Sequence, residues 1–272
     1  MDPALIAFGE LVREPEIDLG RGALAIAAIE HPDLIADHEV KRLDELAARS
    51  AAAAIGDPLR ALHRLREFLF EEEGFRGNRD EYYDPRNSCL NDVLDRRLGI
   101  PITLSVLTIE VGRRLGLAME GIGLPGHFIV SVRVGEEAVL LDPFDAGSVV
   151  THERAGDLVA RALLRRVSLT AEHFAPVARR HILLRMLANL RSIYWQREDW
   201  QKALAVAERM VLVEPEAPAL VRDRGTALVK LRQLQRGAAD WERYLTRCPE
   251  AADAKTVRVQ LRRLRQHLAA LN

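Results

Sequence analysis

The amino-acid sequence predicts a mainly helical α+β protein with a small antiparallel sheet near the middle of the chain. Apolar residues recur at helical spacing on both sides of this middle region. Within it, two short apolar runs, Phe128–Val132 and Ala138–Leu141, bracket a turn at Gly135, which indicates a β-hairpin. In the C-terminal part, Pro215 and Pro249 lie 34 residues apart, which indicates a helical repeat.

The composition is typical of a soluble globular protein. The 272 residues are 48% hydrophobic and 29% charged, and the formal net charge is −1. This charge and the 5% aromatic content argue against a nucleic-acid-binding role, and no apolar run has the length of a membrane span. Cys89 and Cys248 lie far apart, and the N-terminal residues lack the pattern of a signal peptide. We therefore expect a cytoplasmic protein without nucleic-acid or membrane partners.

Residues 1–75 are expected to form a helical segment that packs on the core. The four helices predicted here are Ala4–Val12, Leu19–Glu30, Ala36–Ala54 and Leu59–Glu73. In the third, Leu43 and Leu46 belong to an apolar stripe with helical spacing. The fourth begins after Asp57-Pro58, where the acid can cap the helix and proline suits its first turn.

Residues 76–175 hold most of the turn residues and are predicted to form the α+β core. A helix capped by Asn87 or Ser88 is expected to run to Arg97, where Gly99-Ile100-Pro101 breaks the helical pattern. The elements predicted after this break are a helix over Thr103–Leu115, strands over Phe128–Arg133 and Ala138–Leu141, and a helix over Asp157–Leu164. The polar segment Phe75–Asp84 is expected to be a loop.

Residues 176–272 are predicted to form helical repeats with a capping helix. The 34-residue spacing equals the period of the tetratricopeptide repeat (TPR), a helix–turn–helix unit. Leu190, Tyr194, Ala203 and Pro215 fall at the offsets expected for a first unit. The second unit fits less well, because Gly237 stands where the first has Ala203. An unrelated helical bundle is the alternative interpretation.

His127 and Asp142 are the candidate catalytic residues suggested by spacing. His127 precedes the first strand of the predicted hairpin, and Asp142 ends the second. Adjacent antiparallel strands can place the imidazole opposite the carboxylate, which is how a catalytic histidine is commonly oriented. The alternative is structural, with His127 in a polar turn and Asp142 starting an Asp-Pro turn.

Several motifs, in order along the chain, resemble the transglutaminase-like (papain-like) fold, and more narrowly the SirB-type transglutaminase-like family with a C-terminal TPR-like region. They read YYDPRNS, NDVLDRRLGIPITLSVL, RRLGL, GxGxPGHF and LLDPFDAG. The resemblance is close from about Phe75 to Gly147 and looser in the flanking helices. It implies a catalytic Cys at the start of a helix, a His at the next strand and an Asp on its partner. On this sequence the His falls on His127 and the Asp on Asp142.

The Cys position of the family pattern falls on Pro101, which has no nucleophilic group. Three other residues are weighed as substitutes. Cys89 precedes Pro101 by twelve positions and is expected to be buried as a small apolar side chain. Thr103 and Ser105 follow in the first turn of the helix, where capping is the alternative role of Thr103. No cofactor or metal ligand set is predicted from the spacing of His and Cys residues.

Two function classes are consistent with these observations. The first is a non-catalytic protein that binds a protein or peptide partner through its TPR-like helices or its central groove. The second is a hydrolase or acyl-transferase acting on amide or ester bonds, in which His127 and Asp142 serve a nucleophile other than the usual Cys. Pro101 favours the first class, and the retained His–Asp pair favours the second.

Overall fold

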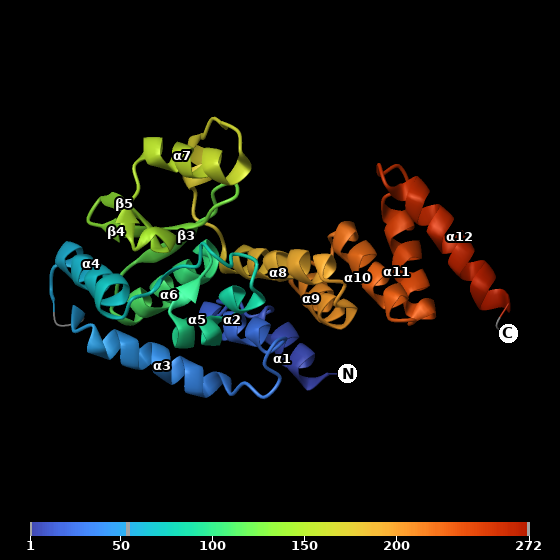
Figure 1. Ribbon diagram of the computed structural model, residues 1–272, viewed down its shortest axis with the longest axis horizontal. Coiled ribbons are helices and arrows are strands. Elements are labelled where there is room, and N and C mark those ends of the chain that lie inside the picture. Colours follow the sequence, from blue (N-terminus) through green and yellow to red (C-terminus); the bar gives the residue numbers. More distant parts are fainter. Residues whose placement is uncertain (1, 53–54, 271–272) are drawn as a thin grey trace. The chain divides into compact units, whose positions relative to one another are not determined.

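The computed structural model describes residues 2–52 and 55–270, which form two compact units (Figure 1). One, here called the core unit, spans Glu16–Met186. The other, the repeat unit, combines the residues up to Pro15 with those from Leu187 onward. The predicted class is confirmed, since helices predominate and the strands form a small antiparallel sheet. The three-segment division predicted from the sequence stays a prediction.

Three helices and the sheet of the core unit pack around one buried helix, α6. Its first twelve residues, Pro101 to Gly112, are all buried, and it contacts α2, α3, α5 and the sheet. The helices of this unit are α2 (Leu19–Ala27), α3 (Ala36–Arg49), α4 (Pro58–Arg66) with a π-helical continuation (Glu67–Glu72), α5 (Leu90–Arg96), α6 (Pro101–Arg114) and α7 (His152–Leu163). The predicted end of the third helix at Ala54 lies outside the described residues.

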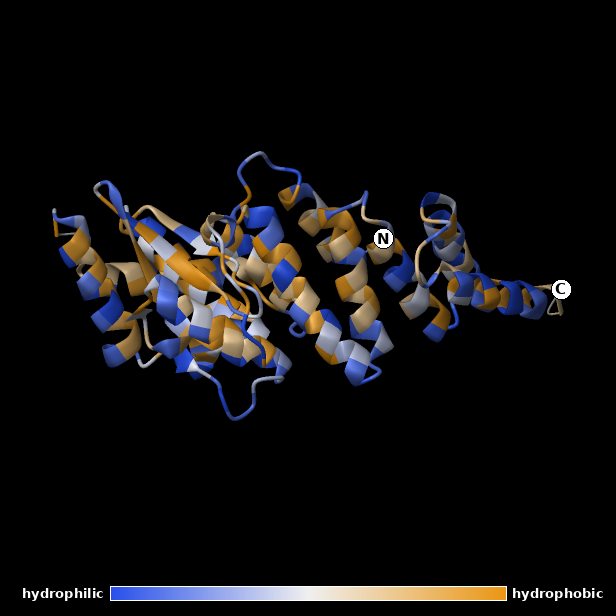
Figure 2. Cartoon of the chain, turned by 90° about the horizontal axis from the view of Figure 1, so that it is seen from above, coloured by the Kyte–Doolittle hydropathy of each residue, from blue (hydrophilic) through white to orange (hydrophobic). Residues whose placement is uncertain are grey.

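The principal sheet has the strand order β3-β4-β5-β6, all antiparallel. Its strands are β3 (Met119–Ile122), β4 (Ile129–Val134), β5 (Glu137–Asp142) and β6 (Ser148–Val149). Hydrophobic residues are concentrated in the strands of this sheet (Figure 2). The predicted hairpin is β4–β5, and the two outer strands were not predicted.

The predicted loop Phe75–Asp84 and the predicted start of the central helix both need correction. The loop contains β1 (Arg76–Gly77), which pairs in parallel with β2 (Leu98–Gly99). The helix begins at Pro101, because proline suits the first helical position and Ile100 supplies the N-cap carbonyl. Thr103 therefore lies inside the helix, so its predicted capping role is wrong.

The described residues of the repeat unit form helices joined by short turns. It contains α1 (Pro3–Leu11), α9 (Trp200–Val213), α10 (Pro218–Lys230), α11 (Leu234–Arg247) and α12 (Ala254–Ala270), while α8 (Arg179–Gln196) includes the division between the units. α1 packs on α9, with Phe8 fully buried. α12 packs on α11 through Val257, Leu261 and Leu264, as a capping helix would.

No helix in the two described ranges is both long and apolar enough to cross a bilayer.

Candidate functional site

A pocket of about 450 Å³ in the core unit brings His127, Asp142 and Pro101 together. His127 lies in the turn before β4, Asp142 at the end of β5 and Pro101 at the first position of α6. His127 is nine-tenths buried and Asp142 is completely buried. The two residues predicted from the sequence therefore line one cavity with the proline.

His127 is positioned by a tight turn that the sequence marks with Pro125-Gly126. The backbone N–H of His127 donates to the carbonyl of Leu124 at 3.1 Å, and Gly126 has a φ of +73°, which favours glycine. A Cβ at Gly126 would also lie 2.8 Å from the Cβ of Ala162. This turn fixes the point at which the imidazole enters the pocket.

Arg185, on α8, holds the same turn from the other side. Its guanidinium donates to the carbonyls of Leu124, at 2.8 Å, and His127, at 2.6 Å, and lies over the ring of Phe128. Burial lowers the pKa of Arg185. Sequence reasoning missed this residue, because it lies 58 positions from His127 and its partners are backbone atoms that leave no sequence motif.

Asp142 orients the imidazole through one carboxylate oxygen and its own turn through the other. Its Oδ2 lies 2.9 Å from Nε2 of His127, and its Oδ1 accepts from the backbone N–H of Phe144 at 3.0 Å. The register of the hairpin, in which Val130 pairs with Leu141, brings the two residues to the same end of the sheet. Because Nε2 is engaged by Asp142, Nδ1 is the nitrogen left for a reacting group.

The mouth of the pocket is aromatic and cationic. The rings of Tyr82 and Phe144 pack edge to face with centroids 6.1 Å apart, and burial raises the pKa of Tyr82. Arg79 and Arg154 both pair with Asp145, at 2.9 and 2.5 Å, so two cations share one acid. Arg161 also lines the cavity. Such a rim favours a ligand that carries a carboxylate or another anionic group.

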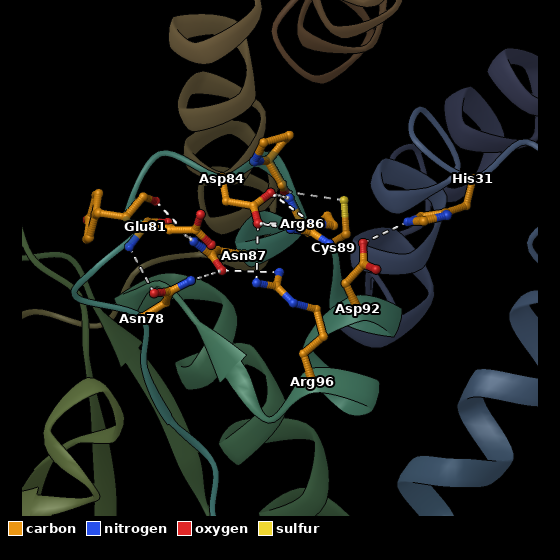
Figure 3. Close-up of polar contacts among 11 residues, drawn as sticks. His31, Asn78, Glu81, Asp84, Arg86, Asn87, Cys89, Asp92 and Arg96 are labelled. Atoms are coloured by element: carbon orange, nitrogen blue, oxygen red, sulfur yellow. Dashed lines mark hydrogen bonds and ion pairs between the residues drawn. The ribbon is translucent and has the colours of Figure 1, made fainter.

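The loop that carries Arg79 and the tyrosines is fixed by a buried amide, Asn87 (Figure 3). Its side-chain nitrogen donates to the carbonyl of Glu81 at 2.7 Å, and its oxygen accepts from the side chain of Asn78 at 3.1 Å. Arg96 reaches the same oxygen at 3.4 Å and pairs with Asp84 at 3.2 Å. The YYDPRNS motif therefore owes part of its pattern to loop anchoring.

The three nucleophile candidates predicted from the sequence lie outside the set of described residues that line the pocket. Ser105 is buried and donates to the carbonyl of Phe128 at 3.5 Å. Thr103 is buried, and its Oγ1 has no hydrogen-bond partner among the described residues. Cys89 is fully buried at the N-cap of α5, where its thiol donates to the carbonyl of Pro85. The catalytic roles of these residues, and those of His127 and Asp142, stay predictions.

The repeat unit has a pocket of its own, of about 420 Å³, between α10, α11 and α12. Its apolar lining comes from Val229, Leu234, Trp241 and Leu264. Its charged or titratable lining is basic throughout the described residues: Lys230, Arg232, Arg263 and His267. An apolar floor with a basic rim is suited to an amphipathic peptide with acidic residues.

Comparison with known proteins assigns both parts of the chain. Residues 37–188 match the transglutaminase-like superfamily, and residues 190–262 match the tetratricopeptide repeat. A UPF0162 protein of Xylella fastidiosa (strain 9a5c) is 37% identical over 256 residues, which covers 92% of this chain and 91% of that protein. A UPF0162 protein of Vibrio cholerae is 29% identical and covers 91% of this chain and 93% of the relative.

Among solved structures, a crystal structure of menin that reveals the binding site for Mixed Lineage Leukemia (MLL) protein aligns with a TM-score of 0.43 and 10% identity. The alignment covers 88% of this chain and 68% of that one. The SirB-type resemblance found in the sequence is confirmed by the two domain matches and the UPF0162 relatives. The match to the transglutaminase-like superfamily spans more than half of this chain, and the Xylella relative is 37% identical over most of both chains. The chain therefore belongs to the transglutaminase-like superfamily and, within it, to the family of UPF0162 proteins.

Proposed function

We propose that this protein is a non-catalytic module that binds a protein or peptide partner. The observation that carries the proposal is Pro101, which lines the pocket beside His127 and Asp142 where a nucleophile would be needed. Proline has no group that can attack a carbonyl, and the neighbouring hydroxyls of Thr103 and Ser105 are buried in α6. The pocket keeps a shape and rim suited to binding, and the described residues of its lining include no cysteine, serine or threonine.

The tetratricopeptide region supports a binding role independently, because stacked helical repeats present extended surfaces for peptide recognition. The basic rim and apolar floor of the repeat-unit pocket provide both charge and hydrophobic contact for a partner. Trp241 belongs to that floor, and tryptophan is enriched among residues that dominate binding energy.

The test is a peptide-display selection against the full-length protein. We expect enriched peptides that bind reversibly, and the double substitution Lys230→Glu and Arg263→Glu should weaken their binding at least tenfold. The matched control pairs Arg13→Glu with Arg243→Glu, which makes the same charge change at exposed arginines outside the pocket lining. Mass spectrometry should recover the bound peptides unmodified. Failure to enrich any peptide, or cleavage or acylation of those bound, would contradict the proposal.

A second candidate function, a hydrolase or acyl-transferase on amide or ester bonds, is favoured by the intact His127–Asp142 pair in a pocket. Fluorophosphonate and iodoacetamide probes should then label Thr103, Ser105 or Cys89, and the label should disappear in His127→Ala. Equal behaviour of wild type and His127→Ala, with no site labelled, would eliminate this candidate.

Restoring a thiol tests whether Pro101 occupies the nucleophile position. In Pro101→Cys, the new thiol would stand at the first position of α6, where the helix dipole and His127 favour the thiolate. We expect iodoacetamide to modify position 101 near neutral pH faster than in the double variant Pro101→Cys, His127→Ala. Equal rates in the two variants would mean that His127 does not serve this position.

A further inference from the structure

A second cluster of reactive side chains lies in the core unit, apart from the His127 pocket. His31 follows α2, and Cys89 and Asp92 stand at the N-cap and in the first turn of α5. One ring nitrogen, the thiol sulfur and a carboxylate oxygen all lie within 4.8 Å of one another. Figure 3 shows Cys89 and Asp92 side by side, with His31 reaching Asp92 from a different segment of the chain.

We propose that His31, Cys89 and Asp92 form a binding site for a divalent transition-metal ion of the zinc type. Thiolate, imidazole and carboxylate together are a ligand set for borderline-soft cations such as Zn²⁺. Bond lengths of about 2.0–2.3 Å to a tetrahedral ion place ligand atoms about 3.3–3.8 Å apart. The widest separation here therefore has to shorten by about 1 Å, which side-chain rotation can provide.

The charges and burial of the three groups suit a cation better than they suit nucleophilic catalysis. Cys89 is completely buried, so a substrate cannot reach its sulfur, while Asp92 is 8% exposed. The side chain of His31 is 37% exposed, which provides a route for an ion and room for a fourth ligand such as water. One thiolate and one carboxylate would balance the two positive charges of the ion, so that no net charge is left buried.

Metal binding replaces two hydrogen bonds seen in the structure. The thiol of Cys89 donates to the carbonyl of Pro85 at 3.5 Å, and Nε2 of His31 lies 2.7 Å from Oδ2 of Asp92. On binding, the S–H bond breaks and a sulfur–metal bond forms, and the proton passes to solvent. The imidazole binds as its neutral form, and the His31–Asp92 contact lengthens as both groups turn to the ion.

The site cannot be recognised from a sequence motif, because its histidine comes from a distant segment. Cys89 and Asp92 are three residues apart, one helical turn, but His31 precedes Cys89 by 58 positions. The site does not depend on the proposed partner-binding function, since His31, Cys89 and Asp92 are absent from the described linings of both pockets.

The experiment titrates the chelator-treated, full-length protein with Co²⁺. We expect one ion per chain, release of protons, the visible bands of tetrahedral cobalt and the near-ultraviolet absorption of a cobalt–thiolate bond. Zn²⁺, which has a filled d shell, should displace Co²⁺ and remove both absorptions. Cys89→Ser should abolish the thiolate absorption, and His31→Gln should weaken binding on the order of 100-fold or more. Cys248→Ser, which removes the other cysteine of the chain, is the matched control and should bind as wild type does.

His31→Gln also guards against misfolding, because its side chain is partly exposed and its replacement leaves the buried thiol in place. Far-ultraviolet circular dichroism without metal checks that each variant is folded. The proposal would be overturned if the wild type showed no cobalt–thiolate absorption at millimolar Co²⁺. It would also be overturned if the absorption were lost in Cys248→Ser and kept in Cys89→Ser. A folded His31→Gln variant that binds as tightly as wild type would overturn it as well.

Discussion

At the residue scale, the buried carboxylate of Asp142 links the hairpin to the following turn. Its two oxygens have different partners, Nε2 of His127 and the N–H of Phe144, and its side chain is fully buried. Asp142→Ala should lower the free energy of unfolding by about 3 kcal/mol, because a buried donor loses its acceptor and a void is left. Asp142→Asn should cost less, about 1 kcal/mol, because the amide oxygen still accepts from Phe144 and the amide nitrogen can donate to Nε2 of His127 in the other imidazole tautomer.

Urea denaturation of the two variants distinguishes a structural from a dispensable carboxylate. If Asp142→Ala and Asp142→Asn lowered the free energy of unfolding equally, the contacts of the carboxylate with Phe144 and His127 would not contribute to stability.

A second prediction at this scale concerns pH. Asp84 caps the turn Pro85–Ser88 and pairs with Arg86 and Arg96. Burial raises the pKa of Asp84, but the hydrogen bonds and charges of Arg86, with the charge of Arg96, outweigh burial, and the pKa is lowered overall. A lowered pKa in the folded state contributes stability above the ordinary Asp pKa of about 3.9, and this is lost as pH falls through the folded value.

Wild type should therefore exceed Asp84→Asn in unfolding free energy at pH 7, and the difference should shrink below about pH 4. Urea denaturation at a series of pH values measures it. A difference that stayed constant down to pH 2 would mean that the Asp84 charge does not stabilise the turn.

Residue types and spacing were enough to select His127 and Asp142, because the hairpin that joins them is local in sequence. The contacts of Arg185 and His31 could not be selected in the same way. Each reaches across about 60 positions, and a lone arginine or histidine in a helical region has no distinguishing pattern. Pro101 was chosen through the family pattern, and the structure shows that it lines the pocket.

At the element scale, helix α6 shows why boundaries were harder to predict than helices. Its apolar stripe was clear, but Pro101 appeared to be a helix breaker, whereas at the first position it is favourable. Strands β3 and β6 were missed because Met119–Ile122 and Ser148–Val149 are too short for an alternating pattern. Pairing with β4 and β5 makes them strands, and this is a tertiary effect.

The close contact of α10 and α11 gives a prediction with opposite signs at two glycines. A Cβ at Gly237 would lie 2.5 Å from a methyl group of Val229 and 2.9 Å from the carbonyl oxygen of Gly225. Gly237→Ala should therefore destabilise the protein by about 1–3 kcal/mol, as overpacking does. At Gly156, inside α7, a Cβ would meet no heavy atom within 4 Å apart from the adjoining backbone of its own helix, and Gly156→Ala should stabilise by about 0.5–1 kcal/mol.

Urea denaturation of both variants measures the two changes in the free energy of unfolding. The weaker fit of the second repeat to the tetratricopeptide pattern then has a physical explanation, because glycine at position 237 allows the two helices to approach. Stabilisation by Gly237→Ala equal to that of Gly156→Ala would contradict this account.

At the scale of the whole molecule, the chain begins and ends in the same unit. The period of the prolines predicted the C-terminal helices, because the repeat is a local pattern. It could not predict that the first helix, α1, contacts α9 about 200 residues later. Apolar periodicity marks which face of α1 is buried, but it does not identify the element that covers that face.

Phe8 tests this long-range packing. Its side chain is fully buried, lies near the guanidinium of Arg209 and belongs to the face of α1 that packs on α9. Phe8→Ala should cost about 3–5 kcal/mol, and because α1 belongs to the repeat unit, the loss should appear there first. In hydrogen exchange, peptides from α9 should exchange faster than in wild type, whereas peptides from α6 should change little.

Ile6→Ala is the matched control, since Ile6 lies on the same helix with 45% of its surface exposed. Faster exchange in α6 with α9 unaffected would show that α1 stabilises the core unit instead.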